Sequence, residues 1–368
     1  MSARALSIVH TEASLGWGGQ EIRILNEALG MAARGHKILI AAPAAARIYT
    51  EARALGLAAT AMPIGRKNGA GLRAMRRLLK TERFDVVNSH SSTDSWLAAL
   101  ARIGLANAPA LVRTRHISAP VSRNWATRWL YACATDRMAT TGETLRHDLI
   151  EALHLDPQRV VSVPTGMNID RFRPGDRAAA RLNTCLPQDL ILVGIVATLR
   201  SWKGHRLLID AIASLGRSDI GLVIVGDGPQ RDALTATAAE RSLANVWMPG
   251  NQADVVPWLN SLDIFALPSY ANEGVPQALV QAMLCERACI TTTVGAIGEA
   301  AIDGQTALIV APQNVDQLAA AIGRLADSAE LRHTLGEAAR KHCVDRFDAT
   351  VMIDRMEKLF FAAVGESQ

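Results

Sequence analysis

Short apolar runs alternate along the whole chain with longer segments that have apolar residues at helical spacing. Residues 37–42 (KILIAA), 85–90 (DVVNSH) and 219–225 (DIGLVIV) are strand-length runs, each followed by an amphipathic segment. This alternation is typical of βαβ units, in which a helix connects two parallel strands. The pattern therefore predicts an α/β protein with parallel sheets.

The alternation is interrupted near residues 165–175 (TGMNIDRFRPG), which are rich in turn formers, and restarts near residue 190. Strands are expected near 5–10, 37–42, 85–90, 110–114, 137–140 and 159–163, then near 190–197, 219–225, 245–248, 262–267, 288–292 and 307–310. We therefore expect two doubly wound domains, 1–175 and 185–347, with a ligand in the cleft between them. The last amphipathic segment, 348–364, reads from its pattern as one more helix of the second domain.

Composition and charge narrow the possible partners. The 368 residues are 49% apolar and 20% charged, and no apolar run reaches the ~18 residues of a membrane span. The N-terminus enters a strand almost directly, so a cytoplasmic protein is expected. Residues 1–170 contain 21 Lys/Arg against 13 Asp/Glu, whereas residues 171–368 contain 18 against 22. A basic first half favours an anionic partner, such as a phosphorylated or lipid-linked molecule or a membrane surface, and no nucleic acid is expected.

Segment 66–83 concentrates this charge, with seven basic residues and one acidic residue. On a helix its apolar positions form a stripe, Leu72, Met75 and Leu79, next to the basic positions Arg73, Arg76, Arg77 and Lys80. One interpretation is a helix at the surface of an anionic membrane. The other is an ordinary helix that covers the sheet and has a basic outer face.

The most informative stretch, residues 268–283, follows the apolar run 263–267. Its loop contains one carboxylate, Glu273, followed by Gly274 and Pro276, and a helix is expected to begin there. A carboxylate and backbone N–H groups at a helix start suit a phosphate next to a hydroxylated group. The expected helix carries Gln281 eight residues beyond Glu273, a rise of about 12 Å, so the two side chains are expected to hold the two ends of a nucleotide-sugar.

Two loops of the first half contain further candidates. Gly16, Gly18 and Gly19 follow the first strand and precede a helix, which suits an anion, although a plain strand-to-helix turn is equally consistent. His116 follows the run 110–114 beside two arginines, and a lone histidine is more often structural than functional.

Two loops of the second half contain the candidate cations and glycines. Arg200 and Lys203 follow the run 190–197 and are placed to neutralise a diphosphate, although a solvated charge pair is the alternative. Gly226 and Gly228 follow the run 219–225 and allow close approach of a ligand. No cluster of acidic residues, Cys or His has metal-ligand spacing.

Taken together, these motifs resemble the retaining glycosyltransferases of the GT-B fold, specifically family 4. The resemblance rests on motifs in the same order: GWGGQE, TRHIS, VPTGMNIDRFRP, LRSWKGH, VGDGP, DIFALPSYANEGVPQALVQAM and VGAIGEAAIDGQTALIV. It implies two Rossmann-like domains that face a central cleft, with the C-terminal helix, 348–364, packed back on the first. It also implies a hexosyl-type, metal-independent enzyme that uses a UDP-, GDP- or ADP-sugar and no cofactor.

By position, the resemblance implies that Lys203 contacts the donor diphosphate, Glu273 the transferred sugar and His116 the sugar or its developing charge. Gly18 and Gly19 fall on the acceptor and phosphate side. The remaining donor-side positions are Thr198, Arg200, Gly226, Gly274, Val275 and Gln281. The expected acceptor is a glycan or lipid-linked molecule of bacterial cell-envelope or lipopolysaccharide synthesis, and the enzyme is expected to be peripheral on the inner membrane face.

The sequence also departs from the family pattern. Gln281 replaces the second glutamate, and Thr198 stands where an arginine is usual, with Arg200 nearby as a substitute. A glutamine can still accept a hydrogen bond from a ribose hydroxyl through its amide oxygen. These departures motivate one alternative, a non-catalytic subunit that binds a sugar nucleotide. A second alternative, a GT-B-type sugar-nucleotide epimerase, shares the two-domain architecture.

Overall fold

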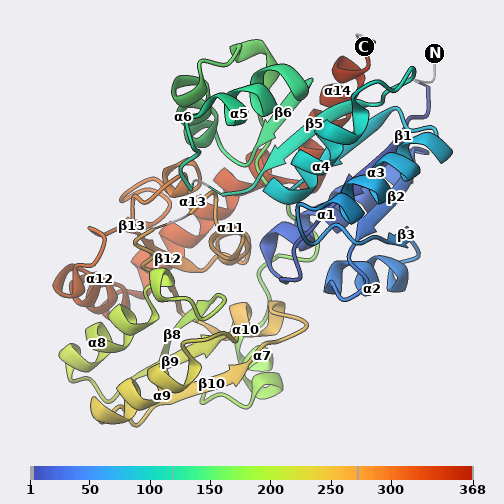
Figure 1. The fold of residues 1–368 in the computed structure, drawn as a ribbon. Coiled ribbons are helices and arrows are strands. Elements are labelled where there is room, and N and C mark those ends of the chain that lie inside the picture. The colour runs from blue at the N-terminus through green and yellow to red at the C-terminus, as the bar shows by residue number, and fades with distance from the viewer. Residues whose placement is uncertain (1–3, 118, 272, 367–368) are drawn as a thin grey trace. The chain divides into compact units, whose positions relative to one another are not determined.

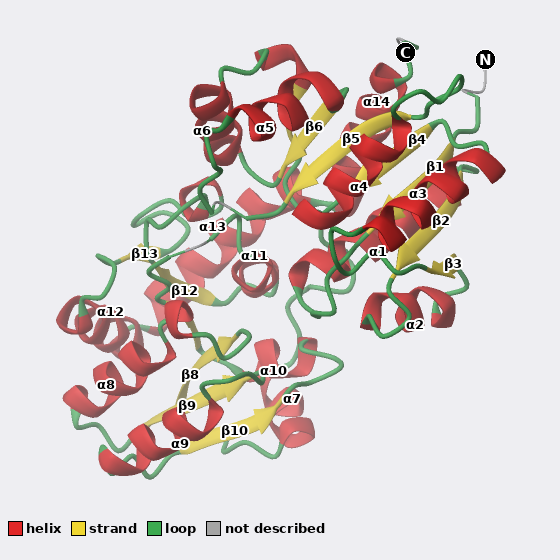
Figure 2. Ribbon diagram, viewed as in Figure 1, coloured by secondary structure: helices red, strands yellow, loops and turns green. Residues whose placement is uncertain are grey.

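The computed structural model describes residues 4–117, 119–271 and 273–366, which form two compact units (Figure 1). The first unit contains the described residues up to Gly166 and those from Ala349 onward, and the second contains residues from Met167 to Asp348. Each unit is a parallel sheet with helices on its faces (Figure 2). The predicted α/β fold with two doubly wound domains is therefore confirmed.

The first sheet has seven strands in the order β3-β2-β1-β4-β5-β6-β7, and all its recorded pairings are parallel. Its strands are β1 (Ser7–Thr11), β2 (Lys37–Ala42), β3 (Ala58–Ala61), β4 (Val86–Ser89), β5 (Ala110–Arg115), β6 (Arg137–Thr140) and β7 (Val160–Ser162). Its helical segments are α1 (Gly19–Ala33), α2 (Arg47–Ala54), α3 (Gly69–Thr81), α4 (Ser92–Arg102), α5 (Trp125–Arg128), the π-helical η1 (Trp129–Ala134), α6 (Glu143–Leu153), the 3₁₀ turn η2 (Pro157–Arg159) and α14 (Ala349–Ala363). Strand β3 has no counterpart among the predicted strands, because its residues are alanines apart from Thr60, the one β-branched residue that would indicate a strand.

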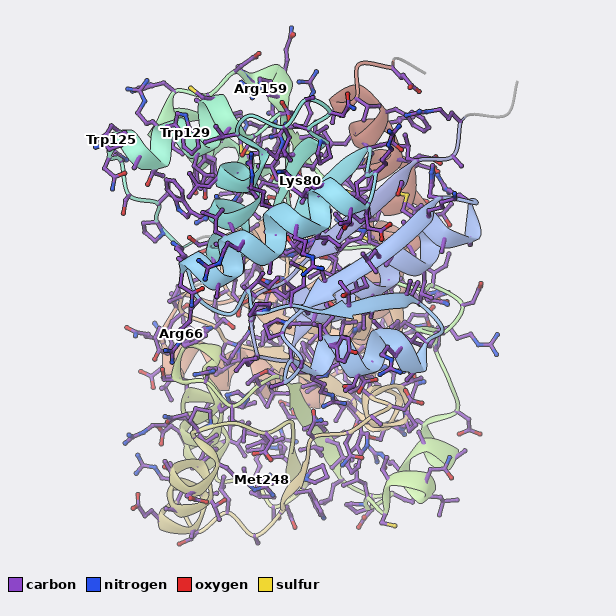
Figure 3. All side chains as sticks on the ribbon, turned by 45° about the vertical axis from the view of Figure 1, so that its right-hand side comes forward. Arg66, Lys80, Trp125, Trp129, Arg159 and Met248 are labelled. Carbon is purple, nitrogen blue, oxygen red and sulfur yellow. The ribbon has the colours of Figure 1, made fainter. Side chains whose placement is uncertain are left out.

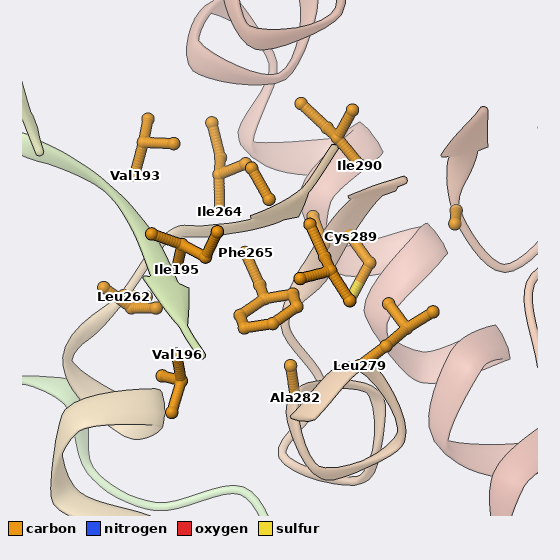
Figure 4. Close-up of a cluster of buried hydrophobic side chains, with 14 of the residues drawn as sticks. Val193, Ile195, Val196, Leu262, Ile264, Phe265, Leu279, Ala282, Cys289 and Ile290 are labelled. Carbon is orange, nitrogen blue, oxygen red and sulfur yellow. The ribbon is translucent and has the colours of Figure 1, made fainter. Parts of the chain in front are cut away.

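The second sheet has six strands in the order β10-β9-β8-β11-β12-β13. They are β8 (Ile191–Val196), β9 (Ile220–Val225), β10 (Val246–Gly250), β11 (Ile264–Leu267), β12 (Ala288–Thr291) and β13 (Leu308–Ile309). The helices are α7 (Arg177–Thr184), α8 (His205–Leu215), α9 (Arg231–Glu240), α10 (Val256–Ser261), α11 (Gln277–Leu284), α12 (Val315–Asp327) and α13 (Ala329–Phe347), with 3₁₀ turns η3 (Ser201–Lys203) and η4 (Ile297–Glu299). Its core surrounds the fully buried Phe265, with Ile195, Leu262 and Leu279 among its neighbours (Figure 4).

The division between the units differs from the expected end of the first domain at residue 175. Residues 167–175 belong to the second unit because their backbone is bonded there. The amide of Met167 donates to the carbonyl of Phe347 (2.6 Å), and the amide of Gly175 donates to Oδ1 of Asn260 (3.2 Å). Turn-forming residues marked the loop, but its hydrogen bonds decide which unit it joins.

Helix α14 is part of the first unit rather than a further helix of the second. Its buried side chains share one core cluster with Ile8 of β1, Val86 of β4 and Val112 of β5, and with Leu6 just before β1. The α14 residues in this cluster are Met352, Ile353, Met356, Leu359, Phe360 and Phe361. The first unit therefore depends on the two ends of the chain.

Helix α3 decides between the two interpretations of the basic segment. Its apolar residues Met75 and Leu79 are buried in the core of the first unit, and Leu72 packs against that core. The interpretation in which this apolar stripe inserts into a membrane is therefore wrong, because the stripe is already covered by protein. The side chain of Arg76 is also engaged, since it donates to the carbonyls of Ala101 (2.8 Å) and Ile103 (2.7 Å).

The other basic side chains of this segment are exposed. Arg73, Arg77 and Lys80 lie on the outer face of α3. Figure 3 labels Arg66, at the start of the segment, and Lys80, in the last turn of α3. Within the described residues, the helices are too short or too polar to cross a membrane.

Candidate active site

The order of each sheet indicates where a ligand would bind. In both units the strand order reverses beside the first strand, between β1 and β4 and between β8 and β11. In open α/β sheets, ligands bind at this switch point, at the carboxyl ends of the strands. The predicted site residues of the second unit follow β8, β9 and β11, and those of the first unit follow β1 and β5.

Lys203 and Glu273 lie in direct contact at the switch point of the second unit. The ammonium group of Lys203 donates to Oε1 of Glu273 (2.6 Å), and the Lys203 side chain is 21% exposed against 5% for Glu273. The hydroxyl of Ser269 donates to the same oxygen (2.6 Å). An ammonium group has three N–H donors, so this contact leaves Lys203 two for a ligand.

Two glycines allow the loops around this ion pair to pack. Gly204 has φ +81°, and a Cβ atom there would lie 2.2 Å from the carbonyl oxygen of Pro268. Gly295 has φ +60°, and its Cβ would lie 1.9 Å from the carbonyl oxygen of Glu273 itself. Both positions therefore exclude a side chain on steric and conformational grounds. The backbone next to Lys203 can thus lie close to Pro268, and the backbone at Gly295 close to Glu273.

The Glu273 loop differs from its predicted form in one respect. Helix α11 begins at Gln277, and Pro276 is its N-cap residue rather than its first helical residue. The prediction of a continuous helix from Glu273 to Gln281 is therefore wrong. The separation of these two side chains is not set by the rise of a helix. Gln281 is half-buried, and its Nε2 contacts Sδ of Met167 (3.7 Å). Asn272, next to Glu273, lies outside the described residues.

The remaining donor-side positions surround the same edge of the sheet. Thr198 and Arg200 are exposed in the loop after β8, and Gly226 directly follows β9. Val275 is 7% exposed, and Gly274 is partly buried beside it.

A cavity of about 340 Å³ adjoins the loop that follows β8. Its lining includes Arg200, Gly204, His205, Gln230 and Tyr270. Burial, and then the positive charge of Lys203, lower the pKa of His205 to about 4. This ring is therefore neutral at pH 7, and Lys203 and Arg200 provide the positive charge of this loop.

In the first unit, helix α1 begins at Gly19, and Gly18 is its N-cap residue. The φ of Gly18 is −176°, an extended conformation open to any residue, so the glycine is not required by its backbone angle. The N-terminus of α1 nevertheless lies after β1, as the pattern predicted.

Two buried carboxyl groups near this turn were not among the predicted site residues. Glu12 follows β1 and is 1% exposed; it accepts hydrogen bonds from the amide of Ser14 (2.7 Å) and from the side chain of Gln20. Asp94, at the start of α4, accepts from Oγ1 of Thr11 (2.8 Å). Burial and the neighbouring charge of Asp94 raise the pKa of Glu12 to about 8, and burial raises the pKa of Asp94.

His116 lies just after β5, as predicted, and two further histidines connect it to the interior. Its Nε2 lies 3.0 Å from Nδ1 of His90, whose Nε2 lies 3.1 Å from Nδ1 of His10. His10 and His90 are 1% and 5% exposed, and His116 is partly exposed. Burial lowers the pKa of all three rings, that of His10 to about 3.

The predicted neighbours of His116 have other partners. Arg113 stacks over the ring of Tyr131 (4.2 Å to the centroid), and Arg115 donates to the hydroxyl of Tyr131 (3.1 Å). They hold the segment after β5 rather than joining His116. His10 and His90 were not predicted as site residues. The feature of the sequence that could have identified them is their position as polar residues at the ends of the apolar runs SIVHT and VVNSH.

Glu27 and Arg23 of α1 form a buried pair behind this histidine chain. Nε of Arg23 lies 3.8 Å from Oε2 of Glu27, and both side chains are fully buried. Asn88 of β4 donates to Oε1 of Glu27 (3.0 Å), which lies 3.9 Å from Nδ1 of His10. Burial raises the pKa of Glu27 to about 7. Among the described residues, no three His, Cys, Asp or Glu side chains are grouped to hold a metal ion.

Comparisons with known proteins agree with this architecture. The family profile "Glycosyl transferases group 1" matches residues 176–342, and the profile "Glycosyltransferase Family 4" matches residues 17–171. The chain is 27% identical over 296 residues to a D-inositol 3-phosphate glycosyltransferase from Saccharomonospora viridis, covering 72% of this chain and 68% of that protein. It spans 52% of a relative of similar name from Catenulispora acidiphila.

Solved structures show the same fold. A glycosyltransferase from Rickettsia africae superposes with a TM-score of 0.88 at 19% identity, covering 99% of this chain and 100% of that one. HepE from Anabaena, in complex with UDP-glucose, superposes with a TM-score of 0.86 at 20% identity, covering 97% and 100%. The two family profiles and the two parallel sheets show that this chain is a glycosyltransferase of the GT-B fold that belongs to glycosyltransferase family 4.

Proposed function

We propose that this chain is a retaining, metal-independent glycosyltransferase that moves a hexosyl group from a nucleotide-sugar to a glycan or lipid-linked acceptor. The observation on which the proposal chiefly rests is the contact between Lys203 and Glu273 at the switch point of the second sheet. A buried carboxylate for sugar hydroxyls next to an ammonium group for phosphate oxygens suits a sugar diphosphate. The structure of Anabaena HepE with UDP-glucose supports a donor of this class.

The chemistry follows from the charge that develops during transfer. When the glycosyl–phosphate bond breaks, the sugar becomes oxocarbenium-like and the bonding electron pair remains on the diphosphate. We assign Lys203 and Arg200 to that diphosphate, because preorganised positive charge stabilises the leaving group without a divalent ion. The leaving phosphate oxygen then takes the proton of the acceptor hydroxyl, which attacks from the same face and retains the anomeric configuration.

The proposal also includes the residue roles that the family resemblance implies. Glu273 and His116 contact the sugar, Gly18 and Gly19 lie on the acceptor and phosphate side, and the donor is UDP-, GDP- or ADP-linked. The remaining donor-side positions are Thr198, Gly226, Gly274, Val275 and Gln281. Gln281 would accept a ribose hydroxyl through its amide oxygen.

The basic first half supports an anionic acceptor. We propose a lipid-linked or lipopolysaccharide-type glycan of the bacterial cell envelope, which the enzyme would reach from the cytoplasm as a peripheral protein on the membrane. A small phosphorylated cyclitol is the second candidate acceptor, because relatives at 27–29% identity are named D-inositol 3-phosphate glycosyltransferases. Both acceptors place negative charge near the first unit.

Two assays test the proposal. Thermal-shift screening with UDP, GDP and ADP identifies the base, because a ligand that binds the native state raises its unfolding temperature. Transfer from the matching sugars to lipid-linked acceptors and to D-inositol 3-phosphate then identifies the acceptor. Nucleotide binding without turnover of any donor and acceptor pair would favour the non-catalytic subunit, and interconversion of sugars would favour the epimerase.

Replacement of Lys203 tests the site itself. We expect Lys203→Ala to lower kcat by ~10² or more, because it removes charge stabilisation from the transition state. Lys203→Arg should retain part of the activity, and Lys341→Ala, at an exposed position on α13, is the matched control. Near-normal turnover by Lys203→Ala, with an unfolding temperature like that of the control, would contradict the assignment.

A further inference from the structure

The three histidines of the first unit form one continuous hydrogen-bonded chain. It begins at His10 of β1, continues through His90 after β4 and ends at His116 after β5, with nitrogen separations of 3.1 and 3.0 Å. The ring centroids are 5.3 and 5.2 Å apart, and the planes of His10 and His90 differ by only 15°. The chain therefore joins three neighbouring strand ends of the first sheet.

The donors and acceptors of three neutral imidazole rings allow this chain two possible arrangements of its protons. A neutral imidazole has one N–H donor and one acceptor lone pair. Both nitrogens of His90 are engaged, so the two hydrogen bonds must point in the same direction. Either His10 donates to His90 and His90 to His116, or the direction of both bonds is reversed.

The buried end at His10 distinguishes the two arrangements. Its Nε2 has no hydrogen-bond partner among the described residues, and the ring packs edge-on against Phe360. The reversed arrangement would leave a buried N–H donor unpaired there, whereas the first leaves only a lone pair. Orphaned buried N–H groups are the rarer and more costly defect.

The nearest carboxyl group favours the same arrangement. Oε1 of Glu27 lies 3.9 Å from Nδ1 of His10, beyond hydrogen-bond distance, but its negative partial charge favours a proton on Nδ1, which donates to His90. The other charged group close to Glu27 is Arg23, whose Nε lies 3.8 Å from Oε2. Low pKa values keep the three rings neutral near pH 7. Each ring therefore has one N–H donor and one acceptor lone pair.

From this geometry we infer that His10 and His90 are positioning residues that hold His116 in its Nδ1–H tautomer. Nε2 of His116 then accepts from His90, and Nδ1–H is the group left for a ligand, because no partner of Nδ1 occurs among residues 4–117, 119–271 and 273–366. His116 therefore offers a hydrogen-bond donor and not a base. The inference rests on the proposed function in one respect, that the ligand is a sugar or phosphate oxygen.

This arrangement has a consequence for the transfer reaction. The lone pair of His116 is already used by His90, so His116 does not remove the proton of the acceptor hydroxyl. Its Nδ1–H instead donates to an oxygen that gains or retains negative charge. The proton is then left to the phosphate oxygen of the departing nucleotide, as the proposed mechanism requires.

The tautomer can be observed directly. In protein labelled with ¹⁵N-histidine, long-range ¹H–¹⁵N spectra distinguish a protonated from an unprotonated ring nitrogen, and a His116→Asn variant assigns the signals. We expect a protonated Nδ1 and an unprotonated Nε2 on His116 at pH 7. A protonated Nε2, or a ring protonated at both nitrogens, would overturn the inference.

Two variants of His90 test the positioning role. His90→Gln keeps an amide N–H that can donate to His116, so the Nδ1–H tautomer should persist. His90→Leu removes the donor, and we expect a shift toward the Nε2–H form and a fall in kcat/KM of about tenfold, in line with the loss of one hydrogen bond in the site. An unchanged tautomer in His90→Leu would also overturn the inference.

The spectra separate this inference from the proposed function, since they need no turnover. If the tautomer behaves as expected but His116→Asn is fully active, the histidine chain stands and the catalytic assignment of His116 fails. The signals of His205 and His342, both in the second unit, provide the control for folding. They should be unchanged in both His90 variants.

Discussion

Glu12 shows how the surroundings of one residue set its protonation. It is 1% exposed, and burial together with the charge of Asp94 raises its pKa to about 8 from an ordinary 4.5. Between these two values the native protein holds a proton that the unfolded chain releases. Its contribution to stability is therefore present below about pH 4.5 and is lost as the pH rises through 8.

We predict that Glu12→Gln flattens this pH dependence. The wild-type protein should lose stability between pH 5 and pH 8 by up to about 1.4 kcal/mol per pH unit from this group, and the variant should lose less. The unfolding temperature of both proteins at several pH values measures the difference. Glu82→Gln, at an exposed position, is the control, and equal slopes for wild type and Glu12→Gln would contradict the prediction.

Helix α3 shows how one element can separate two kinds of surface. Met75 and Leu79 face the core, whereas Arg73, Arg77 and Lys80 face solvent. The covered apolar face leaves electrostatic attraction as the only way for this helix to contribute to membrane binding. Each basic residue near an anionic surface contributes about 1 kcal/mol, and salt screens the attraction.

We therefore predict that the double variant Arg73→Glu, Arg77→Glu weakens binding to vesicles containing anionic lipid by tenfold or more, from about 1 kcal/mol for each charge lost. Co-sedimentation at low and high salt measures the effect, which should shrink as salt increases. The matched control is Lys37→Glu, Arg53→Glu, which reverses two exposed charges on other elements of the first unit. Equal binding by the two double variants would exclude a specific role for α3.

At the scale of the whole molecule, the path of the chain couples its two ends. The chain leaves the first unit after Gly166 and returns at Ala349, and Met167 pairs with Asp348 where the two connections run side by side. Helix α14 then packs against α1. A Cβ atom on Gly30 of α1 would lie 2.5 Å from Cδ1 of Ile353 of α14, so this contact is closely fitted.

We predict that Gly30→Val destabilises the protein by about 1–3 kcal/mol, because it overpacks the contact with Ile353. Ile353→Ala in the same chain should restore part of the loss, and thermal unfolding of the two single variants and the double variant gives the coupling between them. Gly56→Val is unsuitable as a control because of its positive φ, so Gly298→Val, where a Cβ meets nothing within 4 Å, replaces it. Purely additive effects at Gly30 and Ile353 would contradict direct packing.

Much of this molecule follows from local sequence patterns. The short apolar runs predicted twelve of the strands. The charged residues in the loops after these runs identified Lys203 and Glu273, which the structure brings into contact. Both signals are local, because a strand and the loop that follows it are encoded within a few residues. Strand β3 was missed because its alanines give no such signal.

The tertiary structure decided what depends on residues far apart in the chain. His10, His90 and His116 are 80 and 26 residues apart in sequence, and only the strand order β1-β4-β5 brings their rings into contact. The same holds for α14, whose apolar face is compatible with either unit until its packing is known. Local periodicity tells which residues are buried, but the partners they meet are set by the order of the strands in the sheet.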